Sequence, residues 1–205
     1  MSLTYKQIQD EVISLRFSES DRASVKNWIN IRLAEVWSME EWLFRRASAS
    51  VSVTSGSTGI TNVPSTFGTA HRLYRSDGIA LRYIEPADYY DIYANQLQTG
   101  TPVDYTIINQ TFLVGPVSGD TASDYLLLYE KRLTPLVADT DVPLLPGEYH
   151  YMLVPGAISF GMGLKSDFTF QFVEMGWQAA IASMRHEYLV DQRGESVQWG
   201  ADPFS

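Results

Sequence analysis

The order of its sequence patterns limits the folds open to this chain most. Apolar residues have helical spacing at both ends of the chain and strand spacing in the middle. Thr4-Tyr5-Lys6-Gln7 has the spacing of a helix capping box. The pair Ser20-Asp21 is a second helix start signal. Apolar residues follow it at the three- and four-residue intervals of an amphipathic helix, namely Val25, Trp28, Ile29, Leu33, Val36 and Trp37. Each helix must bury its apolar side, and the other long helical material lies at the far end of the chain.

That far end begins after Pro143 and Pro146. A first helical segment includes Pro155-Gly156, which predicts a kink or a split there. A longer segment starts at Asp167 and stops at Arg193-Gly194. Its apolar residues are Phe168, Phe172, Met175, Ala179, Ile181, Ala182 and Tyr188. Gly161-Met162-Gly163 lacks the third glycine and the preceding strand of a dinucleotide-binding motif, so it favours a loosened helix or a close helix crossing.

Between the helical ends, turn residues separate short runs of alternating apolar residues. Ser50–Thr54 and Ile60–Val63 flank a Ser/Gly loop, and His71–Arg75 and Ile79–Ile84 flank Asp77-Gly78, a favoured tight-turn pair. A third hairpin turns at Asn109-Gln110. A short helix is predicted from Pro86 through Tyr93, and a last strand at Tyr125–Tyr129.

These spacings predict an α+β fold in which an antiparallel β-sandwich or half-barrel is inserted into a helical bundle built from both chain ends. The expected boundaries are 1–46 and 147–194 for the bundle and 47–146 for the β domain. Residues 195–205 are expected to form an extended C-terminal arm.

Composition excludes several classes of site and protein. The chain has 205 residues and no cysteine, so disulfides, thiolate metal sites and a cysteine nucleophile are excluded. No run approaches the roughly 18 apolar residues of a membrane span, and no signal peptide opens the chain, so we expect no membrane association. The formal net charge of −9 has the wrong sign for gripping phosphates. Such a protein can still surround DNA without binding it.

No arrangement of residues predicts catalysis, a cofactor or a metal. The three histidines, His71, His150 and His186, lack metal-binding spacing, and Ser55–Gly59 lacks the Gly-Lys-Ser/Thr ending of a phosphate loop. Asp139-Thr140-Asp141 lacks the glycine and glutamate of an EF-hand and indicates an exposed acidic linker. We therefore predict that the protein is not an enzyme and uses no cofactor.

Several segments, taken in order, resemble the phage head-to-tail adaptor, or connector, family. They are TYKQIQDEV, VKNWINIRLAEVW, SMEEWLF, GTPVDYTIINQTFLVGPV, YLLLYEKRLTPL and LPGEYHYMLVPGAI. A tryptophan in the second helix and a G-x-P-x-x-Y … P block recur in that family, and they match Trp28, Gly100, Pro102, Tyr105 and Pro116 here. The similarity covers about residues 4–192. Pro155-Gly156 departs from the family pattern, and the final eleven residues match nothing in it.

This resemblance implies a structural protein of the virion neck, assembled in the host cytoplasm. It implies a homo-oligomeric ring of about twelve copies that docks on the portal protein, meets a tail or stopper protein and lets DNA pass without specific binding. The alternative is a β-sandwich binding module of a phage tail or baseplate, for instance one that binds carbohydrate. It is supported by the clustered Tyr89, Tyr90 and Tyr93, although core packing explains these tyrosines better.

The C-terminal arm is the predicted partner-binding segment. It is mostly polar, yet it contains Trp199 and Phe204, which it cannot bury by itself. We expect these side chains, with Val197 and Arg193, to contact the portal or a neighbouring subunit. Packing against the chain's own surface is the alternative.

Overall fold

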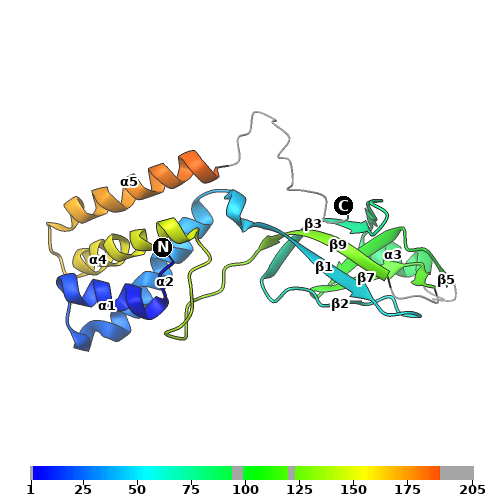
Figure 1. Ribbon diagram of the computed structural model, residues 1–205, viewed down its shortest axis with the longest axis horizontal. Helices are drawn as coiled ribbons and strands as arrows, with labels where there is room; N and C mark the ends of the chain where they lie inside the picture. The colour runs from blue at the N-terminus through cyan, green and yellow to red at the C-terminus, as the bar shows by residue number, and fades with distance from the viewer. Residues whose placement is uncertain (1, 94–98, 120–122, 190–205) are drawn as a thin grey trace. The chain divides into compact units, whose positions relative to one another are not determined.

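The computed structural model describes residues 2–93, 99–119 and 123–189, which divide into two compact units. Among the described residues, one unit contains 2–45 and 133–189, and the other contains the residues between 46 and 132. The first unit is helical and the second consists mainly of strands (Figure 1).

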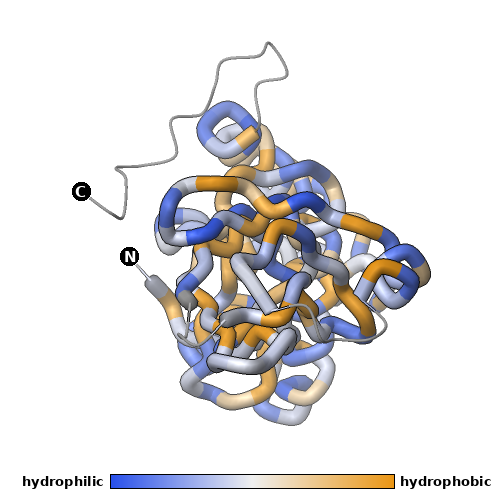
Figure 2. Tube along the Cα trace, turned by 90° about the vertical axis from the view of Figure 1, so that its right-hand side faces the viewer, coloured by the Kyte–Doolittle hydropathy of each residue, from blue (hydrophilic) through white to orange (hydrophobic). Residues whose placement is uncertain are grey.

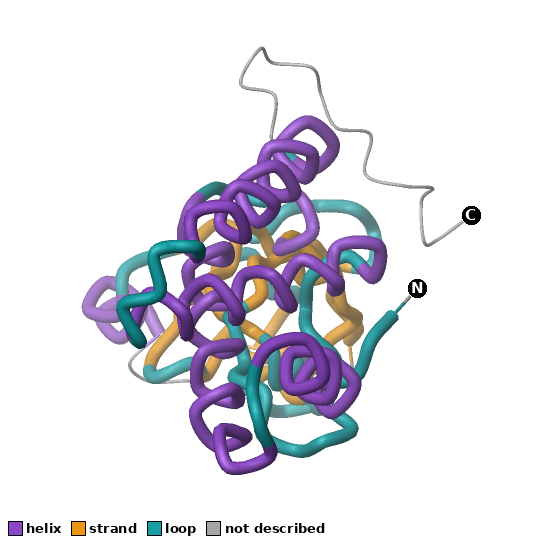
Figure 3. Tube along the Cα trace, turned by 90° about the vertical axis from the view of Figure 1, so that its left-hand side faces the viewer, coloured by secondary structure: helices purple, strands orange, loops and turns teal. Residues whose placement is uncertain are grey.

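The helical unit contains four long helices and three short 3-10 helices within its described residues (Figure 3). Helix α4 contacts the other three long helices and is the centre of the unit. The long helices are α1 (Tyr5–Arg16), α2 (Arg22–Met39), α4 (Leu153–Leu164) and α5 (Phe170–Tyr188), and the 3-10 helices are η1 (Glu19–Asp21), η2 (Leu43–Arg45) and η3 (Gly147–Met152).

The first two helices begin where side chains satisfy free backbone donors. The Thr4 hydroxyl accepts from the Gln7 N–H at 3.3 Å, and the Gln7 side chain accepts from the Thr4 N–H at 2.8 Å. This is the predicted capping box. The 3-10 helix η1 has Ser18 as its N-cap, whose N–H donates to the Asp21 carboxylate at 3.1 Å. Helix α2 follows at Arg22 with Asp21 as its N-cap, which is where the predicted start signal Ser20-Asp21 places it.

The core of the helical unit depends on two glycines in α4. A Cβ at Gly156 would lie 2.6 Å from Cε3 of Trp177, and one at Gly161 would lie 2.7 Å from Cε3 of Trp28. Real Cβ atoms do not approach that closely, so both positions let an indole pack against the α4 backbone. The close helix crossing expected at Gly161-Met162-Gly163 is therefore present at Gly161.

The predicted interruption at Pro155-Gly156 is wrong in position. The change from 3-10 to α-helix falls between Met152 and Leu153, and α4 continues through both residues to Leu164. Pro155 lies in the first turn of α4, where a proline is tolerated because its fixed φ suits the helix.

The β unit has nine strands and one helix in its described part. The larger sheet has the order β2-β1-β9-β3, and smaller sheets have the orders β4-β6-β7 and β5-β8. Pairing is antiparallel except between β4 and β6 and between β5 and β8. The elements are β1 (Arg46–Val53), β2 (Ile60–Thr61), β3 (Phe67–Arg75), β4 (Arg82–Tyr83), α3 (Pro86–Tyr93), β5 (Thr99–Gly100), β6 (Asp104–Ile108), β7 (Thr111–Gly115), β8 (Val117–Ser118) and β9 (Ser123–Lys131).

Two of the three predicted hairpins form as expected. Strands β1 and β2 pair, and β6 and β7 pair around Asn109 and Gln110, whose φ angles of 49° and 67° suit a tight hairpin turn. The Asp77-Gly78 turn also forms, with Gly78 at φ 79°. The third hairpin forms next to this turn, because the Arg75 N–H donates to the Ile79 carbonyl at 2.9 Å and the Leu81 N–H donates to the Leu73 carbonyl at 2.8 Å. From Arg82 onward the chain departs from the prediction, since β4 pairs with β6. Figure 2 shows hydrophobic and hydrophilic residues alternating along this unit.

The fold is thus a mixture of helices and mainly antiparallel sheets, as the sequence predicts. Its described strands form no closed barrel. None of the described helices is long and apolar enough to cross a membrane.

Candidate interaction surfaces

Helix α5 carries apolar side chains on two faces. The inner face buries Trp177, Ile181 and Met184 in the helical core. Three other large apolar side chains point outward: Phe172 is 78% and Met175 67% exposed, and Phe168, in the turn before α5, is 84% exposed. The expectation that the apolar side of each helix is buried is therefore met by the inner face and not by these residues.

The exposed side of α5 is also free of charge. Between Asp167 and Arg185 the one charged residue is Glu174, which is ion-paired with Arg32 at 2.5 Å. The exposed residues beside the aromatic ones, such as Gln171, Gln178 and Ser183, are neutral. Aromatic residues and methionine are enriched, and charges depleted, at the centres of protein–protein interfaces. We call the exposed residues Phe168, Phe172, Met175, Ala179, Ala182 and His186 the α5 stripe.

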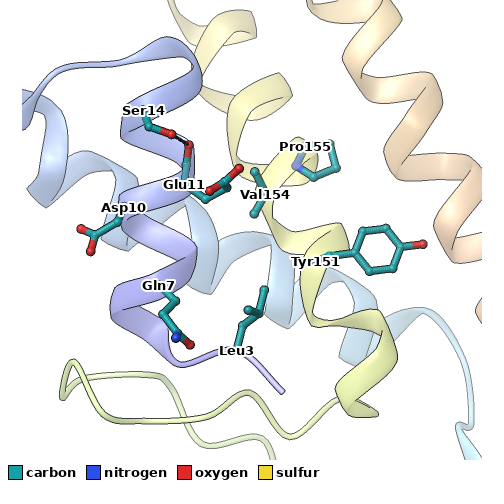
Figure 4. A pocket seen from close by; sticks show the side chains of 8 residues that line it. All are labelled: Leu3, Gln7, Asp10, Glu11, Ser14, Tyr151, Val154 and Pro155. Carbon is teal, nitrogen blue, oxygen red and sulfur yellow. Dashed lines mark hydrogen bonds between the residues drawn. The ribbon is translucent and has the colours of Figure 1, made fainter. Parts of the chain in front are cut away.

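An open groove of about 710 Å³ lies between α1 and the residues where η3 continues into α4. Figure 4 shows Gln7, Asp10, Glu11 and Ser14 along α1, with Tyr151 extending from the other wall. The full lining is Leu3, Gln7, Asp10, Glu11, Ser14, Tyr151, Val154 and Pro155. The groove carries the carboxylates of Asp10 and Glu11, whereas the α5 stripe contains no acidic residue.

A buried arginine fixes α5 to α2 and α4. The Arg32 guanidinium donates to the Gly156 carbonyl at 3.0 Å, to the Ser159 hydroxyl at 3.1 Å and to Glu174 at 2.5 Å. It also donates to Glu35 at 2.7 Å. We call this group the Arg32 cluster. Arg32 was not predicted from the sequence as a site residue. It lies among the apolar residues of the buried face of α2, and its position beside Ile29 and Leu33 was the one signal of a buried charge.

His150 has a structural role. Its Nδ1 accepts from the Leu3 N–H at 3.0 Å, and its Nε2 lies 2.9 Å from the Leu145 carbonyl, which requires Nε2 to donate. The ring is buried and joins the N-terminal segment to the loop before η3. The exposed His71 and His186 lie in different units. The described residues contain no group of three potential metal ligands.

The three clustered tyrosines of α3 have different environments. Tyr89 is buried and donates to the Val114 carbonyl at 2.8 Å, whereas Tyr90 is 49% exposed. Tyr93 donates to Asp104 at 2.8 Å, and its burial beside that carboxylate raises its pKa to about 12. Asp104 also pairs with Arg82 at 2.8 Å. The hydroxyls of Tyr89 and Tyr93 therefore both bond to residues of the sheet and hold α3 on it.

The β unit also has a hollow of about 490 Å³ bordered by aromatic rings. Tyr83 and Tyr105 lie edge to face at its wall, with ring centroids 5.6 Å apart, and Tyr83 is 46% exposed. Phe67, His71 and Gln110 complete much of the lining. The hollow is open and carries one exposed aromatic ring, so it lacks the paired aromatic faces that would enclose a sugar.

The predicted partner-binding residues Arg193, Val197, Trp199 and Phe204 lie outside the described residues. Among the described residues, the α5 stripe is a further candidate interaction surface. Its largest residues were already visible in the sequence as Phe168, Phe172 and Met175. What the sequence could not tell is that they face outward.

The chain belongs to the SU10 adaptor protein family, whose model matches residues 3–201. This match confirms the resemblance to phage head-to-tail adaptors and makes the protein a phage adaptor, a structural component that contacts other virion proteins. No curated protein sequence matches the chain at a significant level.

Proposed function

We propose that this chain is the subunit of a homo-oligomeric ring, of about twelve copies, that joins a phage portal to the tail or to a stopper protein. The ring docks on the portal and surrounds the DNA channel. Family membership over residues 3–201 is the observation that carries this proposal.

The charge of the chain supports a channel that does not bind DNA. With 24 acidic and 15 basic residues, the subunit repels phosphates, and a ring of such subunits multiplies that repulsion. DNA therefore passes through the ring without being held. No basic surface is needed for this role.

We further propose that the C-terminal arm docks on the portal or on a neighbouring subunit. Trp199 and Phe204 are its anchors, and Val197 and Arg193 add contacts. A buried aromatic anchor contributes on the order of 2 kcal/mol or more to binding. A ring links many such sites, so small losses in each arm add up to loss of attachment.

Electron microscopy of the purified protein mixed with its portal tests this function. We expect a ring of density on the portal, and about twelve adaptor copies by light scattering. One copy bound to a whole portal would contradict the ring.

The arm is tested by changing Trp199 and Phe204 to alanine together. Portal attachment should be lost while circular dichroism and melting temperature stay unchanged. Tyr90→Ala is the matched control, because it removes an exposed aromatic ring from α3. Undiminished attachment of the double variant would contradict a docking arm, and a large fall in its melting temperature would show that the arm packs on its own subunit.

A further inference from the structure

The spacing of the α5 stripe is that of a seam between two helices. Five of its members lie in α5, and Phe168 lies in the turn before it. The residues Phe168, Phe172, Met175, Ala179, Ala182 and His186 are separated alternately by four and three residues, and all are exposed. Alternating intervals of four and three place side chains along one line that faces a partner helix. The residues that α5 buries in its own unit lie outside this line. Within residues 2–93, 99–119 and 123–189, no helix packs against the stripe.

The symmetry of the stripe suits a second copy of α5 as its partner. Its members are placed symmetrically about Trp177, so that an antiparallel copy of α5 would set Phe172 opposite Ala182 and Met175 opposite Ala179. The remaining pair is Phe168 with His186. Antiparallel helix pairs bring positions of this kind together across the seam, and interdigitation favours a large side chain facing a small one.

The residues beside the stripe also suit a second copy. Gln178 would lie near Gln178 of the partner, and its amide, which now donates to Glu174 at 3.0 Å, has hydrogen-bonding capacity left for that contact. On the other side Gly176 would face its own copy, and a Cβ at Gly176 would meet nothing within 4 Å. No like charges face each other here, although the whole chain carries a net charge of −9.

From this match of size, spacing and charge, we propose that the free chain forms a two-fold symmetric dimer in which α5 packs antiparallel against α5 of a second copy. Phe168, Phe172 and Met175 are the main buried side chains. At roughly 150 Å² each, the six side chains from two copies bury on the order of 900 Å². Their neighbours bring the total near the lower limit of about 1,200 Å² for a specific interface.

This dimer goes beyond the proposed ring and is independent of it. A two-fold contact closes on itself, whereas a ring requires a contact between two different surfaces. We therefore assign the α5 dimer to the chain before assembly. There it covers an apolar surface that would otherwise promote aggregation.

Single cysteine variants test the proposed register, because the native chain contains no cysteine. Gln178→Cys places thiols near the two-fold axis, and a short bis-maleimide should link two chains efficiently. Gln171→Cys is the matched control. It lies six residues from the centre of symmetry at Trp177, so its two copies would be about 18 Å apart along the helix axis, compared with about 3 Å for the copies of Gln178. Equal cross-linking of both variants would indicate parallel helices, and failure of Gln178→Cys to cross-link would likewise overturn the proposal.

A size-swap series tests the pairing without a cross-linker. Light scattering of the free chain at micromolar concentration should give twice the 23.1 kDa of one copy. Ala182→Phe, which puts two aromatic rings in one pair, should weaken the dimer at least tenfold. Adding Phe172→Ala should restore it, since each pair again joins a large and a small side chain. Leu15→Gln, at an exposed position of α1, should leave the dimer intact.

A free chain that stays monomeric at all concentrations would overturn the proposed dimer. The C-terminal arm or the portal would then be the alternative partners of the stripe. An Ala182→Phe variant that stays dimeric would also overturn the dimer. The outcome is separate from that of the proposed ring, which is judged by attachment to the portal. A ring on the portal with a monomeric free chain would refute only the dimer.

Discussion

Replacing Arg32 with methionine should destabilise the helical unit strongly, because one buried side chain joins three helices. Arg32 is 8% exposed, and its guanidinium carbon lies 5.3 Å from the ring centroid of Trp177 and 5.4 Å from that of Phe160. Methionine keeps much of the packing volume. It removes every donor that Arg32 supplies, so the Gly156 carbonyl and the Glu174 carboxylate each lose a partner.

The magnitude follows from the burial of the two charges. Breaking a buried ion pair by removing one partner costs about 3–5 kcal/mol. The Glu174 side chain is 25% exposed and also accepts from the Ser159 hydroxyl at 2.7 Å, so part of its charge remains solvated or hydrogen-bonded. We therefore expect the lower end of the range, about 3 kcal/mol. With a urea m-value of about 1.5 kcal/mol/M, the unfolding midpoint should fall by about 2 M.

Tryptophan fluorescence during urea unfolding measures this loss selectively. Four of the five tryptophans, Trp28, Trp37, Trp42 and Trp177, lie in the helical unit, and residues 46–132 contain none. The fifth is Trp199 of the C-terminal arm. The double variant Arg32→Met with Glu174→Met removes both charges and should lose at least 1 kcal/mol less than the sum of the two single losses. A loss below about 0.5 kcal/mol for Arg32→Met, or additive single losses, would refute the idea that these charges act as a unit.

Two further predictions concern the helical unit. Gly161→Ala should lower the free energy of unfolding by about 1–3 kcal/mol, because its Cβ would meet Trp28 and Phe17, whereas the control Gly163→Ala, whose Cβ would lie 4.0 Å from Phe170, should be neutral or slightly stabilising in the same urea assay. Equal effects of the two changes would argue against a tight crossing at Gly161. Burial, followed by the charges of Asp139 and Asp141, raises the pKa of Tyr5 to about 12 from an ordinary value near 10. Since the folded state holds this proton more tightly, the stabilisation is complete below pH 10 and is lost as the pH rises to about 12. Tyr5→Phe, which removes the bond to the Lys26 carbonyl at 2.8 Å, should cost about 1 kcal/mol at neutral pH but should show a shallower stability loss above pH 10. Parallel pH profiles for Tyr5→Phe and the unchanged protein would contradict this cause.

The parts of the fold that local chemistry decides were predictable. Thr4 and Gln7 cap α1 because both partners lie within four residues, and Asn109-Gln110 turns because of its own backbone preferences. What happens after the Asp77-Gly78 turn depends on a distant strand. There β4 pairs with β6, whose Asp104 accepts from Arg82 at 2.8 Å. No local spacing predicts that pairing.

Arg32 shows a second limit of sequence reasoning. Its neighbours Ile29 and Leu33 correctly predict a buried side of α2, but a charge within that side has no fixed meaning until its partners are known. The partners Ser159 and Glu174 lie more than 120 residues away. An arginine side chain could equally have extended to solvent from the edge of the buried face. The Arg32 cluster therefore had to come from the structure.

Helix α5 shows a third limit of prediction from sequence, because it has enough apolar residues to form two apolar faces. Periodicity finds a face that can be buried, but it does not rank two candidates, and large apolar residues occur on both faces. The helical unit selects the face with Trp177, since Gly156 leaves room for that indole against the α4 backbone. Phe172 and Met175 are consequently turned outward. An adaptor must keep surface available for other chains, and here that surface arises because a glycine in α4 determines which side of α5 enters the core.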